Sequence, residues 1–152
     1  MRKFLYILTF IPFLLLGCEY TPIYSNKDNF NFKIENIDFT GDAEINNLID
    51  KKLKKYKTTK NGEKISISTF SSYEKISQSK NLSGKTTDYL VVIKTNFKME
   101  IDDKTKTLIF REEFLLKNFS NKFEENNFEK IKKENSIDLI INKLIIQISQ
   151  MQ

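Results

Sequence analysis

The sequence predicts an α+β fold, a two-layer sandwich in which two helices cover one face of a four-stranded, mainly antiparallel sheet. Two observations predict this fold class. Four segments alternate apolar and polar side chains, as half-buried strands do, and two others repeat apolar residues at helical spacing. Their order is strand, helix, three strands, helix, which gives one sheet layer and one helix layer. A length of 152 residues fits one such domain with a short appended segment.

The first strand and the first helix are predicted between residues 30 and 56. Apolar and polar residues alternate over residues 30–34, and the alternation resumes at residues 37–39 after a slip of one residue. Gly41 and Asp42 then end the strand and can cap a helix. The helix is predicted by its apolar stripe, which consists of Ile45, Leu48, Ile49, Leu53 and Tyr56.

Three further strands are predicted between residues 65 and 116. The first contains a bulge and reaches about residue 76, and the polar residues 77–88 follow as a flexible connection. The clearest strand covers residues 89–101, with apolar side chains on one face and mainly charged ones on the other. A tight hairpin turn at residues 102–106 leads into the last strand.

The second helix is predicted to begin with residues 124–127, whose acidic side chains suit a first helical turn. Many residues of its apolar face are isoleucines, which have modest helix propensity. Packing on the sheet must therefore supply most of the stability of this helix. The predicted apolar face consists of Phe128, Ile131, Ile137, Ile140, Ile141, Leu144, Ile145 and Ile148.

Composition favours binding over catalysis. The chain has no His and one Cys, which excludes His-dependent triads, an internal disulfide framework and zinc-ribbon chemistry. The net charge is +5, but the abundant Lys, Asn, Ile and Phe all have A/T-rich codons, so the charge is weak evidence for a nucleic-acid partner. We expect a protein without enzymatic activity, metal or cofactor.

The N-terminus has the pattern of a signal peptide. Arg2 and Lys3 precede an apolar run over residues 4–16, which is short for a membrane span of about 20 residues and typical of a signal-peptide core. The run ends in Leu15-Leu16-Gly17-Cys18, which resembles the lipobox of bacterial lipoproteins. The alternative is an uncleaved signal anchor in which Cys18 is an ordinary buried thiol.

The lipobox resemblance divides the chain into three parts. Residues 1–17 would be the lipoprotein signal peptide, residues 18–29 the acylated N-terminus and tether, and residues 30–152 the folded domain. Cys18 would carry the lipid, and multiple acyl chains hold a protein firmly at a bilayer. Glu19 is not the Asp that typically marks inner-membrane retention in enterobacteria, which favours the periplasmic side of the outer membrane.

The chain resembles the LPS-assembly lipoprotein family (LptE) over nearly its whole length. Members typically begin the mature protein with Cys, an aromatic residue two positions on, Pro two after that, and Leu-Tyr. Here the segment reads Cys18-Glu19-Tyr20-Thr21-Pro22-Ile23-Tyr24, with Glu19 in place of the usual Gly. The predicted element order and size also match the family, while the body shares periodicity more than identities.

The resemblance implies a non-enzymatic envelope protein. Members of this family plug the lumen of a large outer-membrane β-barrel, LptD, assist its folding and bind lipopolysaccharide during its transport to the cell surface. The resemblance thus implies two partners, an LptD-like barrel and lipopolysaccharide. A rival hypothesis is a periplasm-facing lipoprotein module that binds a lipid or a cell-wall ligand and has no barrel partner.

A lipopolysaccharide site needs cations for phosphates beside apolar surface for acyl chains. Arg111 suits bidentate phosphate binding, although pairing with Glu113 or Glu100 would also explain it. Each lysine also has a simpler interpretation as a solvated side chain on a strand or turn. The candidate lipopolysaccharide-binding residues are Arg111, Lys94 and Lys98 on the strand face away from the helices, and Lys104 and Lys106 at the hairpin tip.

Overall fold

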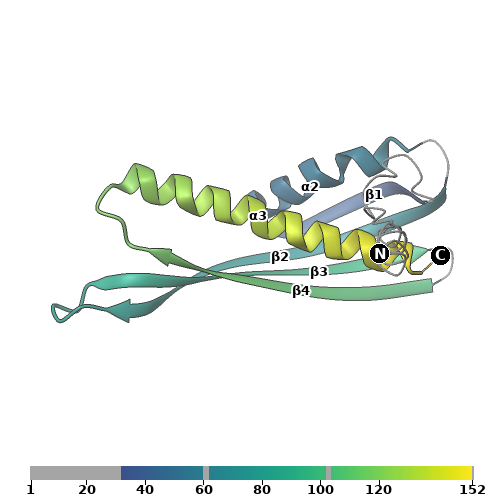
Figure 1. Cartoon of the computed structure of the whole chain (residues 1–152). Coiled ribbons are helices and arrows are strands. Elements are labelled where there is room, and N and C mark those ends of the chain that lie inside the picture. Colours follow the sequence, from purple (N-terminus) through teal and green to yellow (C-terminus); the bar gives the residue numbers. More distant parts are fainter. Residues whose placement is uncertain (1–31, 60–61, 102–103, 152) are drawn as a thin grey trace, which may run out of the picture.

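The computed structural model describes residues 32–59, 62–101 and 104–151, which form one elongated two-layer body (Figure 1). The signal peptide, Cys18, the tether and the family motif at residues 18–24 all lie outside the described residues. The elements, in chain order, are β1 (Phe32–Gly41), α2 (Ala43–Lys57), β2 (Glu63–Lys80), β3 (Thr86–Ile101), β4 (Lys104–Lys117) and α3 (Lys122–Ser149).

The four strands form one sheet in the order β1-β2-β3-β4. β1 pairs with β2 in parallel, whereas β2, β3 and β4 pair antiparallel as a meander. Both helices lie on the same face of this sheet, with α3 running along much of its length (Figure 1). The predicted α+β sandwich is confirmed. The predicted slip in the first strand is confirmed too, as a register shift between Ile34 and Asn36.

The crossover from β1 to α2 begins at a close backbone contact with β2. Asp42 caps α2, its side chain accepting a hydrogen bond from the backbone N–H of Ile45 at 2.9 Å. The N–H of Asp42 donates to the carbonyl oxygen of Ser71 at 3.0 Å. Gly41 has a φ of 92°, and a Cβ at this position would collide with that same oxygen. Glycine is therefore required where the strand turns into the helix.

The core lies between the sheet and the two helices. α2 contributes its predicted stripe, in which Ile45, Ile49 and Leu53 are fully buried. The rings of Phe32 and Tyr56 stack at a centroid distance of 5.6 Å and join β1 to the end of α2. The largest fully buried side chains outside α2 are Phe32, Ile34, Ile65, Ile67, Ile93, Phe97, Met99, Leu116 and Ile137.

The prediction of a flexible connection at residues 77–88 is wrong. β2 continues to Lys80 and β3 begins at Thr86, so the two strands form a hairpin arm that projects past the helix layer at one end (Figure 1). Backbone hydrogen bonds and polar cross-strand contacts, such as Ser77 to Thr86 at 2.9 Å, hold this arm. Because the arm is largely exposed on both faces, its strands do not need to alternate apolar and polar side chains. The sequence of residues 77–88 therefore lacks the pattern that predicts a strand.

Two details of the second helix also differ from the prediction. The helix begins at Lys122, because the side chain of Asn121 caps it by accepting from the N–H of Phe123 at 2.9 Å. Ile131 is 56% exposed and is not part of the buried face. The buried positions around it are Glu125, Lys133 and Ser136, all polar, while Phe128 packs against the core and remains partly exposed.

Candidate functional site

Three of the predicted cations lie on the sheet face that no described helix or strand covers, referred to below as the uncovered face. Lys94 on β3 and Arg111 on β4 stand directly opposite each other in the strand register. Lys98 shares their face four residues further along β3, about 13 Å away. The structure therefore brings Lys94 and Arg111 together and places Lys98 on the same face at a distance from them.

Each of these three cations has a carboxylate partner within its own sheet. Nζ of Lys94 lies 3.6 Å from Oε1 of Glu74, and Nζ of Lys98 lies 3.1 Å from Oε1 of Glu100. Arg111 forms its ion pair with Glu113, which is one of the two partners that the sequence suggested. All six side chains are at least 40% exposed, so these ion pairs add little to stability.

Lys104 and Lys106 do not join this group. They are exposed residues of β4, opposite Ile101 and Met99 of β3, whose side chains belong to the helix-covered side of the sheet. Side chains at matching positions of paired strands share a face. The two lysines at this end of the sheet therefore point to the opposite side from Lys94, Lys98 and Arg111, and the five cations do not form one site.

The uncovered face also carries large apolar side chains. Phe70 is 53% exposed and Ile109 is 73% exposed, and both stand opposite Asn96 in the register. Ile76 and Leu115 are 46% and 58% exposed and flank Leu90 in the same way. Clusters of exposed apolar residues bounded by charges mark interaction surfaces.

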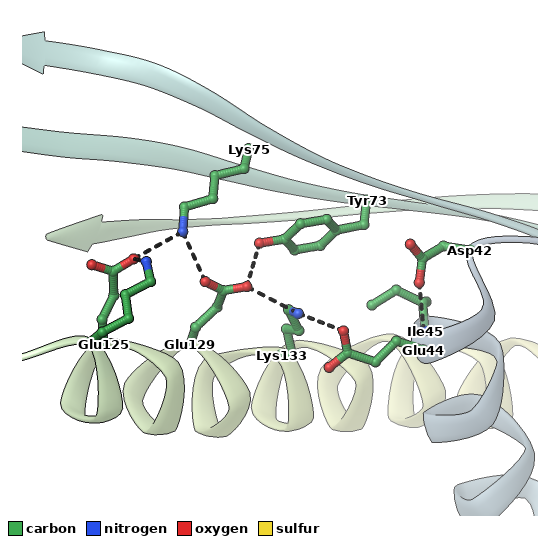
Figure 2. A network of polar contacts seen from close by, with 9 residues as sticks. Asp42, Glu44, Ile45, Tyr73, Lys75, Glu125, Glu129 and Lys133 are labelled. Atoms are coloured by element: carbon green, nitrogen blue, oxygen red, sulfur yellow. Dashed lines mark hydrogen bonds and ion pairs between the residues drawn. The ribbon is translucent and has the colours of Figure 1, made fainter. Parts of the chain in front are cut away.

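A second cluster of charges lies inside the sandwich, between β2 and the first half of α3 (Figure 2). Glu129 is at its centre and receives three donors. The hydroxyl of Tyr73 donates to it at 2.7 Å, and the Nζ atoms of Lys75 and Lys133 each lie 3.0 Å from its carboxylate oxygens. Lys133 also reaches Glu44 of α2 at 2.7 Å, so the network joins three elements.

Glu125 extends this network toward the start of α3. Its side chain is 1% exposed and accepts from Lys122 at 2.5 Å and from Lys75 at 3.2 Å. Aromatic rings support the lysines as well. Nζ of Lys75 lies 4.7 Å from the ring centroid of Tyr89, and Nζ of Lys133 lies 4.4 Å from that of Tyr73.

The ionisation of the network follows from these contacts. Burial disfavours a charged Glu129, but hydrogen bonds from Tyr73, Lys75 and Lys133 outweigh it and lower the pKa of Glu129 to about 2. Burial and the bond to Glu129 together raise the pKa of Tyr73. The hydrogen bond from Lys122 lowers the pKa of Glu125 despite its burial. All these groups hold fixed charge states at neutral pH, which suits a structural role better than proton transfer. The network of Tyr73, Lys75, Glu125, Glu129 and Lys133 is called the ionic clamp below.

A hollow of about 290 Å³ opens beside this clamp, lined by Glu44, Asn126, Glu129, Lys130 and Lys133. Its carboxylates are already paired with Lys133. Over residues 32–59, 62–101 and 104–151 there is no group of three or more His, Cys, Asp or Glu residues that could hold a metal ion. Because these carboxylates already have a cationic partner, we interpret the hollow as a surface opening beside the charged network.

Sequence reasoning missed the clamp, although a signal was present. Glu125, Glu129 and Lys133 recur every four residues and lead directly into Ile137 and Ile140, so they occupy the same helical stripe as the apolar face. Charged residues of both signs on a stripe that should be apolar indicate buried pairs. Tyr73 on β2 provides the matching partner from the sheet.

None of the helices among the described residues is long and apolar enough to cross a bilayer.

Neither a family model nor a curated protein matches the chain. Solved structures do resemble it. The rare lipoprotein B from Shewanella oneidensis aligns with a TM-score of 0.51 and 14% identity, over 76% of this chain and 96% of that one. Lipoprotein B from Nitrosomonas europaea aligns with a TM-score of 0.54 and 13% identity, over 80% of this chain and 86% of that one. This chain thus shares its fold with two bacterial lipoproteins.

Proposed function

We propose that this chain is an LptE-like outer-membrane lipoprotein that plugs an LptD-like β-barrel, helps it assemble and binds lipopolysaccharide on its way to the cell surface. The observation that carries the proposal is the uncovered face, where Lys94, Lys98 and Arg111 stand among exposed apolar side chains. Phosphates beside acyl chains need this combination. The role is one of binding, and no catalytic step is proposed.

Anchoring at the outer membrane rests on the N-terminal sequence. Gly17-Cys18 ends an apolar run after two basic residues, which is the arrangement that a lipoprotein precursor requires. The two fold neighbours are themselves lipoproteins, which supports an envelope location for a domain of this shape. The lipid on Cys18 would hold the domain at the periplasmic side of the bilayer.

The barrel partner is tested by gentle detergent extraction of membranes that express the tagged full chain, followed by affinity purification and mass spectrometry. A large outer-membrane β-barrel should elute in a fixed ratio with the chain. Recovery without a barrel would contradict the plug and favour the rival, a periplasm-facing module for a lipid or a cell-wall ligand.

The lipopolysaccharide site is tested with the variant Lys98→Ala/Arg111→Ala. Loss of two cations from the uncovered face should weaken lipopolysaccharide binding about tenfold or more, because charge-assisted hydrogen bonds to phosphate contribute about 1.5–3 kcal/mol in partly desolvated sites. Lys51→Ala/Lys54→Ala removes the same charge from exposed positions of α2 and serves as the matched control. If both variants bound lipopolysaccharide equally well, the uncovered face would not be the binding site. The description of the fold would not change.

A further inference from the structure

The uncovered face has a charge pattern that is complementary to itself. On the uncovered face, every second residue of β3 stands between one residue of β2 and one residue of β4. These residues form a row across the three strands. The row of Val92 contains Glu74 and Glu113, and the next row, that of Lys94, contains Arg111. An acidic row therefore lies beside a basic row at the middle of the face.

We propose that this face is also a self-association surface, on which a second copy of the chain packs sheet to sheet with its strands antiparallel. The two-fold axis would lie across the strands, between the rows of Val92 and Lys94. Each strand then faces its own counterpart, and the acidic row of one copy covers the basic row of the other. An interface of this kind is isologous, so every contact occurs twice.

The charge match is direct on β4. Residue 111 of one copy faces residue 113 of the other, so Arg111 lies over a second Glu113 in addition to the one it already contacts within its own chain. Glu74 of one copy likewise comes beside Lys94 of the other. Two rows further from the axis, Asp88 of β3 faces Lys98. Complementary charges at an interface fix its register and suppress alternative pairings.

The same axis also matches the apolar rows. The row of Leu90, with Ile76 and Leu115, comes to face the row that contains Phe70 and Ile109. Ile76 then covers Phe70 on β2, and Leu115 covers Ile109 on β4. These four side chains are between 46% and 73% exposed in the single chain, so the pairing removes exposed apolar surface on both copies.

Self-association does not depend on the barrel or on lipopolysaccharide. It occupies the surface that the proposed function uses, so the dimer would be the state of the chain before a partner covers this face. Sheets packed face to face keep their strand directions within about 30° of each other, which preserves the match for the rows nearest the axis.

The test is site-specific crosslinking of the full chain in a Cys18→Ser background, where no other thiol remains. One sample carries Ile109→Cys, another carries Leu115→Cys, and a third is their equimolar mixture. Packed sheets are about 10 Å apart, so a bismaleimide of about that span is used. A covalent dimer is expected in the mixture and in neither single variant, because two copies of residue 109 would lie about 20 Å apart along the strands.

The single variants are the matched control. They show how much crosslinking comes from random collisions or from association through the apolar run at residues 4–16. Crosslinking of the single variants as efficient as that of the mixture would overturn the proposal, and so would absence of a dimer in all three samples. Arg111→Glu in the mixed pair should reduce the dimer, because Glu113 of the partner copy then faces a like charge. Adding Glu113→Arg should restore it, and failure of this rescue would also contradict the proposed register.

Discussion

The two halves of α3 are attached to the sheet by different forces. In the first half, residues 122–136, the buried positions are Glu125, Lys133 and Ser136, and Glu129 is 15% exposed. In the second half every buried residue is Ile or Leu, among them Ile140 and Leu144. The same helical stripe thus changes from an ionic clamp to an apolar core along a single helix. Apolar packing tolerates changes of pH and salt, whereas the clamp depends on complete pairing of its charges.

The apolar half should show the largest effect of truncation. Ile140→Ala removes a fully buried side chain and leaves a cavity against the sheet, so the free energy of unfolding should fall by about 2–5 kcal/mol. Urea unfolding followed by circular dichroism measures the change. Leu139→Ala, at a neighbouring position that is 51% exposed, is the control and should stay within about 0.5 kcal/mol of the parent. Equal losses in both variants would contradict the assigned face of the helix.

Breaking the clamp should cost less than opening the core. Glu129→Ala removes the acceptor of Tyr73 and one carboxylate partner of both Lys75 and Lys133, and we expect a loss of about 1–3 kcal/mol in the free energy of unfolding. Lys133 keeps Glu44 as a partner, which limits the loss. A loss larger than that of Ile140→Ala, measured under the same conditions, would show that the clamp rather than the apolar core dominates the attachment of α3.

Acid should weaken the clamp selectively. The pKa of Glu129 is about 2 in the folded chain and about 4.3 when unfolded, so the unfolded state binds the proton more readily and folding stability falls as the pH drops from about 5 to 2. After allowance for screening by solvent, the contribution of Glu129 is about 1–2 kcal/mol, fully present above pH 5. Unfolding curves between pH 7 and pH 3 measure it. The Glu129→Ala variant should have a shallower pH dependence than the parent, and identical slopes would refute the lowered pKa.

The parts of the fold that bury apolar side chains were predictable from the sequence. The stripe of Ile45, Ile49 and Leu53 predicted α2, and the Asp42 cap and the slip after Ile34 were identified from residue types and spacing. The hairpin arm was not predictable in this way. Backbone pairing holds the residues of the arm while their side chains remain exposed. The sequence of the arm therefore lacks the alternation of apolar and polar residues that predicts a strand.

The candidate site was predictable only in part. Strand alternation correctly placed Lys94, Lys98 and Arg111 on one face, because the side-chain period of a strand is fixed. Lys104 and Lys106 lie near the hairpin, but strand alternation puts them on the other face of the sheet, so nearness in sequence does not predict a shared site. The register between strands, which puts Arg111 opposite Lys94, comes from the tertiary structure and cannot be read from either strand alone.

The close contact at Gly41 has a consequence for how this protein can evolve. The chain has four glycines and is rich in amino acids that have A/T-rich codons, whereas every glycine codon begins with two guanines. Any other amino acid at this position carries a Cβ that meets the carbonyl oxygen of Ser71, in a backbone conformation that L residues rarely adopt. A substitution that replaced this glycine would disrupt the junction between β1, α2 and β2, so the backbone geometry keeps a G-rich codon at position 41 in a chain that is otherwise rich in residues with A/T-rich codons.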